Sequence, residues 1–157
     1  MKHYIIYTDG ACRGNQGKER QASWGFIVYD DVTGKRLGSK SDYLGNRTNN
    51  EAELIAMLEA MKWISAKTNT RATIHTDSAY VMNGLLEWMP NWKRNGWKTA
   101  NKGEVKNKEL WQALDKLYDP LIFTIVKVKG HSGVSQNEEV DALCNTVIDD
   151  HDFKERF

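Results

Sequence analysis

The stretch from Tyr4 to Gly10 constrains the fold of this chain more than any other. It reads Tyr-Ile-Ile-Tyr-Thr-Asp-Gly, with large aromatic or β-branched residues on both alternating faces up to Thr8. A strand buried on both faces has this pattern, so we predict a central strand of a sheet. We place Asp9 at the C-terminal tip of that strand, where Gly10 lets the chain turn away. The sequence therefore predicts a carboxylate at the edge of the core, although Asp-Gly alone is also an ordinary turn signal.

A second segment ends in the same way. Ala72 to Asp77 reads Ala-Thr-Ile-His-Thr-Asp, a short β-rich segment that finishes in the same Thr-Asp pair. If the two strands are parallel neighbours, their tips bring two carboxylates together. Ser78 follows and opens a helix, so Asp77 has a competing role as the N-cap of that helix.

The length of 157 residues predicts one domain over residues 1–157, with the charged residues 149–157 as a frayed tail. Cys12 and Cys144 are too few for a disulfide framework and lack metal-ligand spacing, so we expect reduced thiols. The N-terminus has no apolar signal core, and no apolar run is long enough to span a bilayer. We therefore expect a cytoplasmic monomer that needs neither a membrane nor an obligate protein partner.

The remaining segments predict alternating strands and helices. β-rich runs indicate further strands at Trp24 to Asp30, Lys35 to Leu44 and Leu121 to Lys129. Helical periodicity indicates helices from Thr48 to about Ala66, from Ala79 to Trp88 before an interruption at Pro90, from Asn107 to Tyr118, and after Gly133. Between the first two strands we expect a polar loop, Ala11 to Ser23.

This order of elements predicts the architecture. Short links make the first three strands an antiparallel meander, and helical crossovers make the later strands parallel neighbours. The expected fold is α/β, with a mixed five-stranded sheet, the first strand in its middle and helices on both faces.

The segment from Trp88 to Trp111, called here the basic tryptophan segment, carries an uneven share of the charge. It holds six basic residues, two acidic ones and four of the six tryptophans. Sixteen basic and nineteen acidic residues lie elsewhere, so a net charge of +4 sits on a body of −3. Basic residues interleaved with aromatic ones suit a polyanion with stackable surfaces. Packing in a helical core explains the tryptophans equally well.

Acidic residues also lie on the helices. Glu53 falls on the flank of the apolar stripe of the first helix and Glu51 on the opposite flank, so helical geometry does not choose between them. Acidic residues favour helix N-termini through the dipole, which explains both without a function. Asp141 lies at the edge of the stripe of the terminal helix, beside Ile148.

Four carboxylates share one property, since each lies at an element end or on a core-facing flank: Asp9, Glu53, Asp77 and Asp141. An uncompensated carboxylate is costly there, and a cation is the natural compensation. Carboxylates without histidine or cysteine partners suit hard ions such as Mg²⁺ or Mn²⁺. Two such ions about 3.5 to 4 Å apart form a clamp used for phosphodiester cleavage, so the set points to chemistry on nucleic acid.

Six segments together resemble type 1 ribonuclease H in order and approximate spacing. They are Thr8 to Cys12 with Gly14-Asn15, Thr48 to Leu54, Thr76-Asp77-Ser78, Asn91 to Thr99, Gly130 to Gly133, and Asn137 to Asp141. Each motif is short, but the joint match covers roughly His3 to Ile148. The resemblance implies a ribonuclease H-like fold in which the basic tryptophan segment forms a helical protrusion.

The resemblance also implies an activity. It implies an endonuclease that hydrolyses the RNA strand of RNA/DNA hybrids with two Mg²⁺ ions, for which Mn²⁺ substitutes, and leaves 5′-phosphate and 3′-hydroxyl ends. The implied metal-binding and catalytic carboxylates are Asp9, Glu53, Asp77 and Asp141, which selects Glu53 over Glu51. His131 resembles a family histidine that assists proton movement or product departure, although an exposed loop histidine is the alternative.

The substrate-binding residues implied by the resemblance come from several segments. They are Asn15, Thr48, Asn49, Asn50, Ser78, Tyr80, Trp88, Trp92, Lys93, Arg94, Lys98 and Asn107. Thr48 and Asn107 match residues that hold a phosphate of the DNA strand. The chain departs from many members at Gln16, where proline is usual, and at Asn46, where some members have an arginine that here lies one place on, at Arg47.

Two alternatives to this activity remain. One is a DNA nuclease of the wider superfamily, against which the basic tryptophan segment and Thr48-Asn49-Asn50 argue. The other is an inactive hybrid-binding module, against which the presence of all four carboxylates argues.

Overall fold

The computed structural model describes residues 1–14, 19–129 and 134–156, so two predicted site residues, Asn15 and His131, lie outside the described residues. The strands are β1 (Lys2–Arg13), β2 (Gln21–Asp30), β3 (Arg36–Gly45), β4 (Thr70–Thr76) and β5 (Phe123–Lys127). The helices are α1 (Asn49–Ser65), α2 (Ala79–Asn83), α3 (Met89–Arg94), α4 (Lys108–Leu117) and α5 (Ser135–Arg156), and a π-helical turn, η1 (Gly84–Trp88), links α2 to α3.

The five strands form one mixed sheet in the order β3-β2-β1-β4-β5, with β1 in its centre. β1, β2 and β3 pair antiparallel, and β4 pairs parallel with both β1 and β5. This arrangement confirms the predicted sheet. It follows from the links, because stretches of only a few residues join the first three strands in sequence and helices join the parallel ones.

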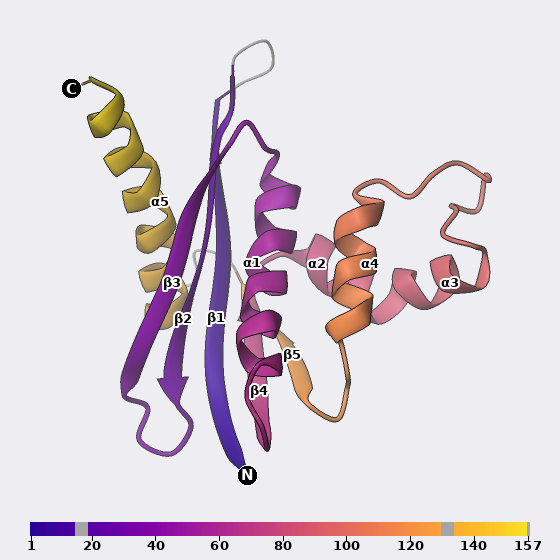
Figure 1. The fold of residues 1–157 in the computed structure, drawn as a ribbon, viewed down its shortest axis with the longest axis horizontal. Helices are drawn as coiled ribbons and strands as arrows, with labels where there is room; N and C mark the ends of the chain where they lie inside the picture. The colour runs from indigo at the N-terminus through magenta and orange to yellow at the C-terminus, as the bar shows by residue number, and fades with distance from the viewer. Residues whose placement is uncertain (15–18, 130–133, 157) are drawn as a thin grey trace.

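Helices cover both faces of the sheet, as Figure 1 shows. Ile6 of β1 belongs to a core with Leu54 of α1 on one face, and its neighbour Tyr7 belongs to a core with Val140 of α5 on the other. Successive side chains of a strand point to opposite faces, so a strand buried on both needs large residues at every position. The run from Tyr4 to Thr8 meets that need. α4 packs on α1, and α3 and the chain that follows it stand apart from the sheet as the predicted protrusion.

β1 does not end at Asp9. It continues to Arg13, and Asp9 pairs with Gly25 of β2 in the middle of the strand. What ends near Asp9 is the pairing with β4, whose last pair joins Tyr7 to His75. The prediction of a strand tip was therefore wrong. The alternation of residues along β1 cannot show that the strand loses its neighbour β4 on one edge while it keeps β2 on the other. The following loop is correspondingly shorter than predicted, since β2 begins at Gln21.

Pro90 does not interrupt the helix before it. The chain stays helical from Ala79 to Arg94, and Pro90 lies in the first turn of α3, where its missing N–H is tolerated. The turn before it is widened, because the amide of Met89 donates to the carbonyl oxygen of Gly84, five residues back.

The C-terminal residues are helical rather than frayed. α5 continues through Arg156, and the ring of His151 stacks on Tyr43 of β3 with centroids 3.6 Å apart. The side chain of Gln21 donates to Asp152. These contacts with distant strands hold the tail, which its own charged sequence does not indicate. Among the described helices, none is both long and apolar enough to cross a bilayer.

Candidate active site

The amide of Gly10 ties two buried carboxylates together. It donates to Asp9 Oδ1 at 2.9 Å and to Glu53 Oε1 at 2.6 Å, and each of these acidic residues is only 4% exposed. A side chain at Gly10 would place its Cβ 2.6 Å from backbone atoms of Ala52 and Glu53. Glycine is therefore required because α1 crosses β1 at backbone contact, not because the chain turns there.

Asp77 completes a compact group with these two residues. One carboxylate oxygen each of Asp9, Glu53 and Asp77 lies within 4.8 Å of the others. Asp77 follows the last residue of β4, as predicted, and it does not cap α2. Ser78 does so, since its Oγ accepts from the amide of Val81 at 3.1 Å.

A cavity of about 290 Å³ opens above this group. Its walls are Asp9, Gly10, Ala11, Cys12, Asn49, Glu53, Asp77, Asp141 and Asn145. Asp141 of α5 thus faces the same space from the other side, although it stands outside the compact group of three. We call this space the acidic cavity. None of its lining residues is a lysine or an arginine, so the described wall offers no cation of its own.

The electrostatics of the acidic cavity favour a cation. Burial raises the pKa of Asp9 far above its ordinary value, and the hydrogen bond and charge of Glu53 raise it further. Burial also raises the pKa of Glu53 and of Asp77, although the charge of Lys127 lowers that of Asp77. Glu53 Oε2 is buried and accepts no hydrogen bond among the described residues. An unpartnered buried carboxylate oxygen is costly, and a hard divalent ion would satisfy it.

Glu51 has a different role from Glu53. Its Oε1 accepts from the amide of Thr48 at 3.0 Å, while Thr48 Oγ1 accepts from the amide of Glu51 at 3.1 Å. This reciprocal pair is a capping box, which fixes the start of α1. Arg47 Nη1 also donates to Glu51 Oε2 at 2.8 Å. Helical geometry left the two glutamates equivalent, and their surroundings separate a cap from a buried site residue.

A second cavity, of about 570 Å³, lies between the start of α1 and the start of α4. Arg47 and Asn107 line it, whereas Asn46 does not. Asn46 instead accepts a hydrogen bond from the amide of Arg20. Asn107 has a left-handed backbone with φ 61°, and its Nδ2 donates to Tyr80 Oη at 3.1 Å. Thr48 stands beside this cavity in sequence but does not line it.

The aromatic residues of the protrusion form one connected cluster. Trp92 lies 6.0 Å from Trp88, 6.4 Å from Trp97 and 5.4 Å from Trp111 between ring centroids, and Tyr80 contacts Trp88 and Trp111. Only Trp111 is fully buried, and the other rings keep part of their surface exposed. The rings therefore pack on one another and still keep exposed surface, and their contact with nucleic acid stays a prediction.

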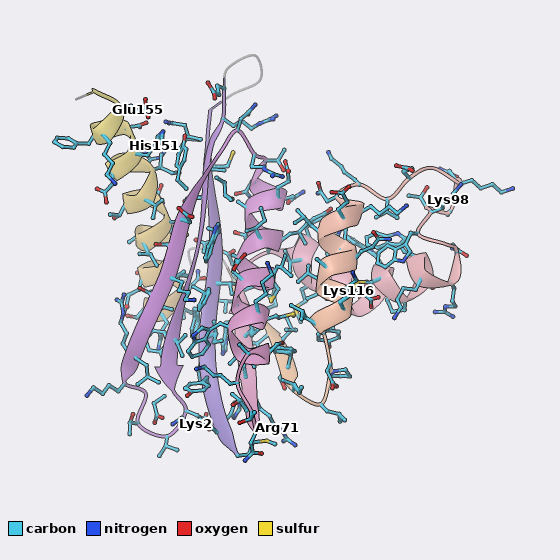
Figure 2. All side chains as sticks on the ribbon, in the orientation of Figure 1. Lys2, Arg71, Lys98, Lys116, His151 and Glu155 are labelled. Atoms are coloured by element: carbon cyan, nitrogen blue, oxygen red, sulfur yellow. The ribbon has the colours of Figure 1, made fainter. Side chains whose placement is uncertain are left out.

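The basic side chains of the protrusion differ in their partners. Lys93 forms an ion pair with Asp115 at 3.1 Å, and Arg94 Nη2 donates to Asn91. Lys98 has no ion pair within the described ranges, and Figure 2 shows it at the outer rim, pointing away from the sheet. The positive charges of Lys93, Arg94 and Lys98 thus differ in how far they are already paired within the protein.

The two predicted asparagines at the start of α1 lie in different surroundings. Asn49 lines the acidic cavity, whereas Asn50 is exposed in the first turn of α1 and lines neither cavity. Sequence reasoning missed Asn145 and Cys12 as lining residues. For Asn145 a signal existed, because it lies four residues after Asp141 and so on the same face of α5.

The strand order, the helices on both faces and the acidic cavity beside β1 define an α/β protein of the ribonuclease H-like fold. A family model described as RNase H matches residues 1–149. Ribonuclease H of Hydrogenovibrio crunogenus is 44% identical over 151 residues, covering 96% of this chain and 98% of that protein. Ribonuclease H of Francisella tularensis subsp. novicida is 48% identical over 145 residues, covering 92% and 90%. The chain therefore belongs to the ribonuclease H family and is an endoribonuclease.

Solved structures show the same fold. LC9-RNase H1, a type 1 RNase H with the type 2 active-site motif, superposes with a TM-score of 0.83 at 27% identity, over 94% of this chain and 72% of that chain. The PFV RNase H domain gives a TM-score of 0.78 at 27% identity, over 94% and 92%. LC11-RNase H1, solved in complex with an RNA/DNA hybrid, shares the fold with a TM-score of 0.70 at 24% identity, over 94% and 98%.

Proposed function

We propose that this enzyme hydrolyses the RNA strand of RNA/DNA hybrids internally, with two Mg²⁺ ions in the acidic cavity, and leaves 5′-phosphate and 3′-hydroxyl ends. The observation that carries the proposal is the compact group of Asp9, Glu53 and Asp77, in which Glu53 Oε2 is buried without a partner. When bound, the ions supply an activated water and stabilisation of the leaving oxygen.

The chain's own residues would hold and orient the reacting groups. Asp9, Glu53 and Asp77 offer oxygens from three different elements to one ion, and Asp141 faces the same space from α5. The amide of Gly10 holds Glu53 Oε1 toward Asp9, which leaves Oε2 free for a ligand. We further propose that His131 assists proton movement or product departure, as the family resemblance implies.

The substrate would lie across the acidic cavity and the protrusion. A protein distinguishes RNA from DNA through the 2′-hydroxyl, which lies in the wide minor groove of an A-like duplex. Asn49 lines the acidic cavity, which supports the proposal that its amide reads the strand that is cut. We propose the same role for Asn15 and Asn50. The other strand would reach the cavity at Arg47 and Asn107 and the aromatic cluster beyond it.

A panel of four substrates tests the activity. Hybrid, duplex DNA, duplex RNA and single strands, each labelled on one strand in turn, are incubated with Mg²⁺ or with chelator. We expect Mg²⁺-dependent internal cuts in the RNA of the hybrid and little action on the others. Efficient cutting of duplex DNA would favour a DNA nuclease, and tight hybrid binding without a cut would favour an inactive module.

A matched pair of variants on one helix tests the site. Glu53→Gln should abolish cleavage, because it removes charge from the compact group. Glu51→Gln should keep cleavage and leave stability little changed, because glutamine at this position can still accept the Thr48 amide in a capping box. Equal activity of the two variants would contradict the assignment of Glu53.

A further inference from the structure

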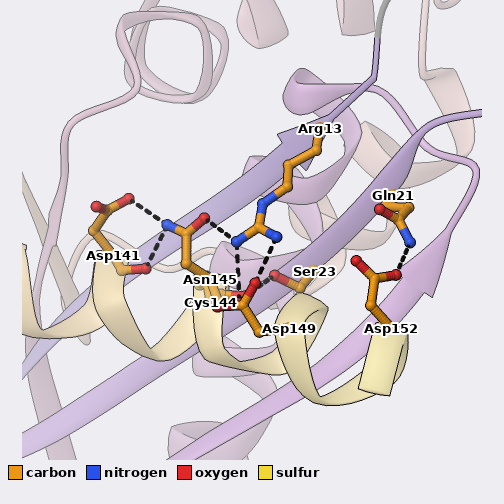
Figure 3. Close-up of polar contacts among 8 residues, drawn as sticks. All are labelled: Arg13, Gln21, Ser23, Asp141, Cys144, Asn145, Asp149 and Asp152. Carbon is orange, nitrogen blue, oxygen red and sulfur yellow. Dashed lines mark hydrogen bonds and ion pairs between the residues drawn. The ribbon is translucent and has the colours of Figure 1, made fainter. Parts of the chain in front are cut away.

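Arg13 and Asn145 connect the β1–β2 hairpin to the wall of the acidic cavity, as Figure 3 shows. Arg13 Nη2 donates to Asn145 Oδ1 at 3.0 Å and to the carbonyl oxygen of Asn145 at 3.3 Å. Arg13 Nη1 donates to Asp149 Oδ1 at 2.7 Å. One guanidinium therefore forms hydrogen bonds with two successive turns of α5 beside Asp141.

The guanidinium fixes which way the Asn145 amide faces. Arginine only donates hydrogen bonds, so the carbonyl oxygen of the Asn145 side chain must face it and the NH₂ group must face the other way. That group points at Asp141, where Nδ2 lies 3.0 Å from the main-chain oxygen and 3.5 Å from Oδ1. A donor directed by Arg13 thus reaches the carboxylate that faces the acidic cavity.

The amide transmits orientation without transmitting charge. An arginine placed directly on Asp141 would offset its negative charge and compete with a cation for its oxygens. Here a neutral amide stands between them, and the charge of Arg13 is balanced by Asp149 on the outer side of the helix. Asp141 therefore remains available to a cation while its side chain is held.

Docking of α5 does not rest on this contact alone. Ser23 Oγ donates to the carbonyl oxygen of Cys144 at 2.7 Å, and Cys144 Sγ donates to the carbonyl oxygen of Asp9 at 3.4 Å. Gln21, on the same hairpin as Arg13, donates to Asp152 one turn beyond Asp149. The helix is thus attached at several other points, so the specific contribution of Arg13 and Asn145 lies in what they do to Asp141.

We infer that Arg13 and Asn145 are positioning residues, which set the Asp141 carboxylate for divalent cation binding across the acidic cavity. The inference rests on the proposed function, in which Asp141 is a metal-binding residue. Residues that orient a metal ligand typically contribute about 10- to 100-fold to metal affinity. Because the contact with Oδ1 is long, we expect the lower end of that range here.

The test measures cation binding by the substrate-free protein. Free Mn²⁺ is titrated and followed by electron paramagnetic resonance for wild type, Asn145→Ala, Arg13→Ala and the double variant that combines them. The control is Gln21→Ala, which removes a contact between the same hairpin and helix away from Asp141. Asn145→Ala should weaken Mn²⁺ binding about tenfold. Arg13→Ala should weaken it in the wild-type background and have no further effect in Asn145→Ala, because it acts through Asn145. Gln21→Ala should leave it within about twofold.

Thermal unfolding in chelator separates orientation from folding, since all three single variants should unfold within a few degrees of one another. If Asn145→Ala does not fold, the Mn²⁺ affinity of the hairpin variant Arg13→Ala tests the inference in its place. Unchanged Mn²⁺ affinity in both Asn145→Ala and Arg13→Ala, or an equal loss of affinity in Gln21→Ala, would overturn the inference. The proposed function would still stand in that case, provided that the wild-type protein binds Mn²⁺ and cleaves hybrid. A wild-type protein that neither binds Mn²⁺ nor cuts hybrid would overturn both.

Discussion

The backbone amide of Gly10 donates a hydrogen bond of 2.6 Å to Glu53 Oε1, which joins the central strand to the first helix at the point where both carry a buried carboxylate. The approach is close because Gly10 has no side chain to hold the helix backbone away. The distance between β1 and α1 therefore sets the geometry of the acidic cavity.

Replacing Gly10 by alanine should push α1 away from β1. The added Cβ would lie 2.6 Å from the backbone of Ala52 and Glu53, and helix backbone cannot rotate aside as a side chain can. We expect a loss of about 1 to 3 kcal/mol of stability and loss of cleavage. Gly38→Ala is the control, because a Cβ there meets nothing within 4 Å. Urea unfolding and hybrid cleavage check both variants, and a fully active Gly10→Ala would contradict the close approach.

Asp9→Asn should stabilise the metal-free protein in a pH-dependent way. Burial and the neighbouring carboxylates raise the pKa of Asp9 above its unfolded value of about 3.9. The contribution of such a group to stability is complete below that pH and is lost as the pH rises toward the folded pKa. In chelator, the melting temperature of Asp9→Asn should therefore exceed that of wild type by more at pH 8 than at pH 5.5. Adding Mg²⁺ should shrink the difference, because only wild type gains from the ion.

The comparison uses the difference between the two proteins, so the titration of groups distant from Asp9 cancels. A melting difference that is the same at both pH values would show that Asp9 is charged throughout. Cleavage by Asp9→Asn at the wild-type rate would exclude it from the metal centre.

Tyr80→Phe should lower the stability of the protein and weaken hybrid binding at the second cavity. Tyr80 Oη accepts from Trp111 Nε1 at 3.2 Å and from Asn107 Nδ2 at 3.1 Å, so its loss leaves the fully buried indole without an acceptor. An unsatisfied buried donor costs about 1 to 3 kcal/mol. We expect that loss in urea unfolding together with weaker hybrid binding, since Asn107 is no longer held. Tyr43→Phe serves as the control, because the Tyr43 hydroxyl makes no hydrogen bond in the part of the chain that is described.

Lys98 and Lys93 should differ in their effect on the salt dependence of hybrid binding. A cation that neutralises a phosphate contributes a salt slope of about 1. Lys98→Ala should lower the slope by nearly that amount, whereas Lys93→Ala should lower it less, because Lys93 is already paired with Asp115. Hybrid binding between 50 and roughly 200 mM salt measures both slopes. Lys35→Ala, in the turn between β2 and β3, should leave the slope unchanged, and equal slopes for Lys93→Ala and Lys98→Ala would contradict the pairing.

The sequence predicts much of this fold because the strongest signals are local. The apolar run of β1, in which Ile6 and Tyr7 face opposite cores, indicates from the sequence alone a strand that is covered on both faces. The helical crossovers then make β4 and β5 parallel neighbours, which brings Asp77 beside Asp9. These steps need only periodicity and the length of the links.

The misplaced features depend on contacts between distant segments. Asp9 lies in the middle of β1 because β1 stays paired with β2 beyond its last pair with β4. The sequence of β1 alone does not show how far each neighbouring strand extends. Glu51 and Glu53 could not be separated from helical geometry, because the difference lies in the amide of Gly10, forty-three positions away. The C-terminal turns of α5 are held through His151 on Tyr43, which their own charged composition hides.

The acidic cavity draws its walls from both faces of the sheet, with Glu53 from α1, Asp141 from α5 and Asp9 on the strand between them. No single hairpin or helix of the fold carries more than one of these three carboxylates. A divalent ion held there would therefore be lost whenever either helix detaches, so its binding free energy adds to every opening that separates the layers. Amide protons of α1, β1 and α5 should then exchange with solvent more slowly, and by a common factor, when the ion is present. A single small ligand would in this way make three separate layers open as one cooperative unit.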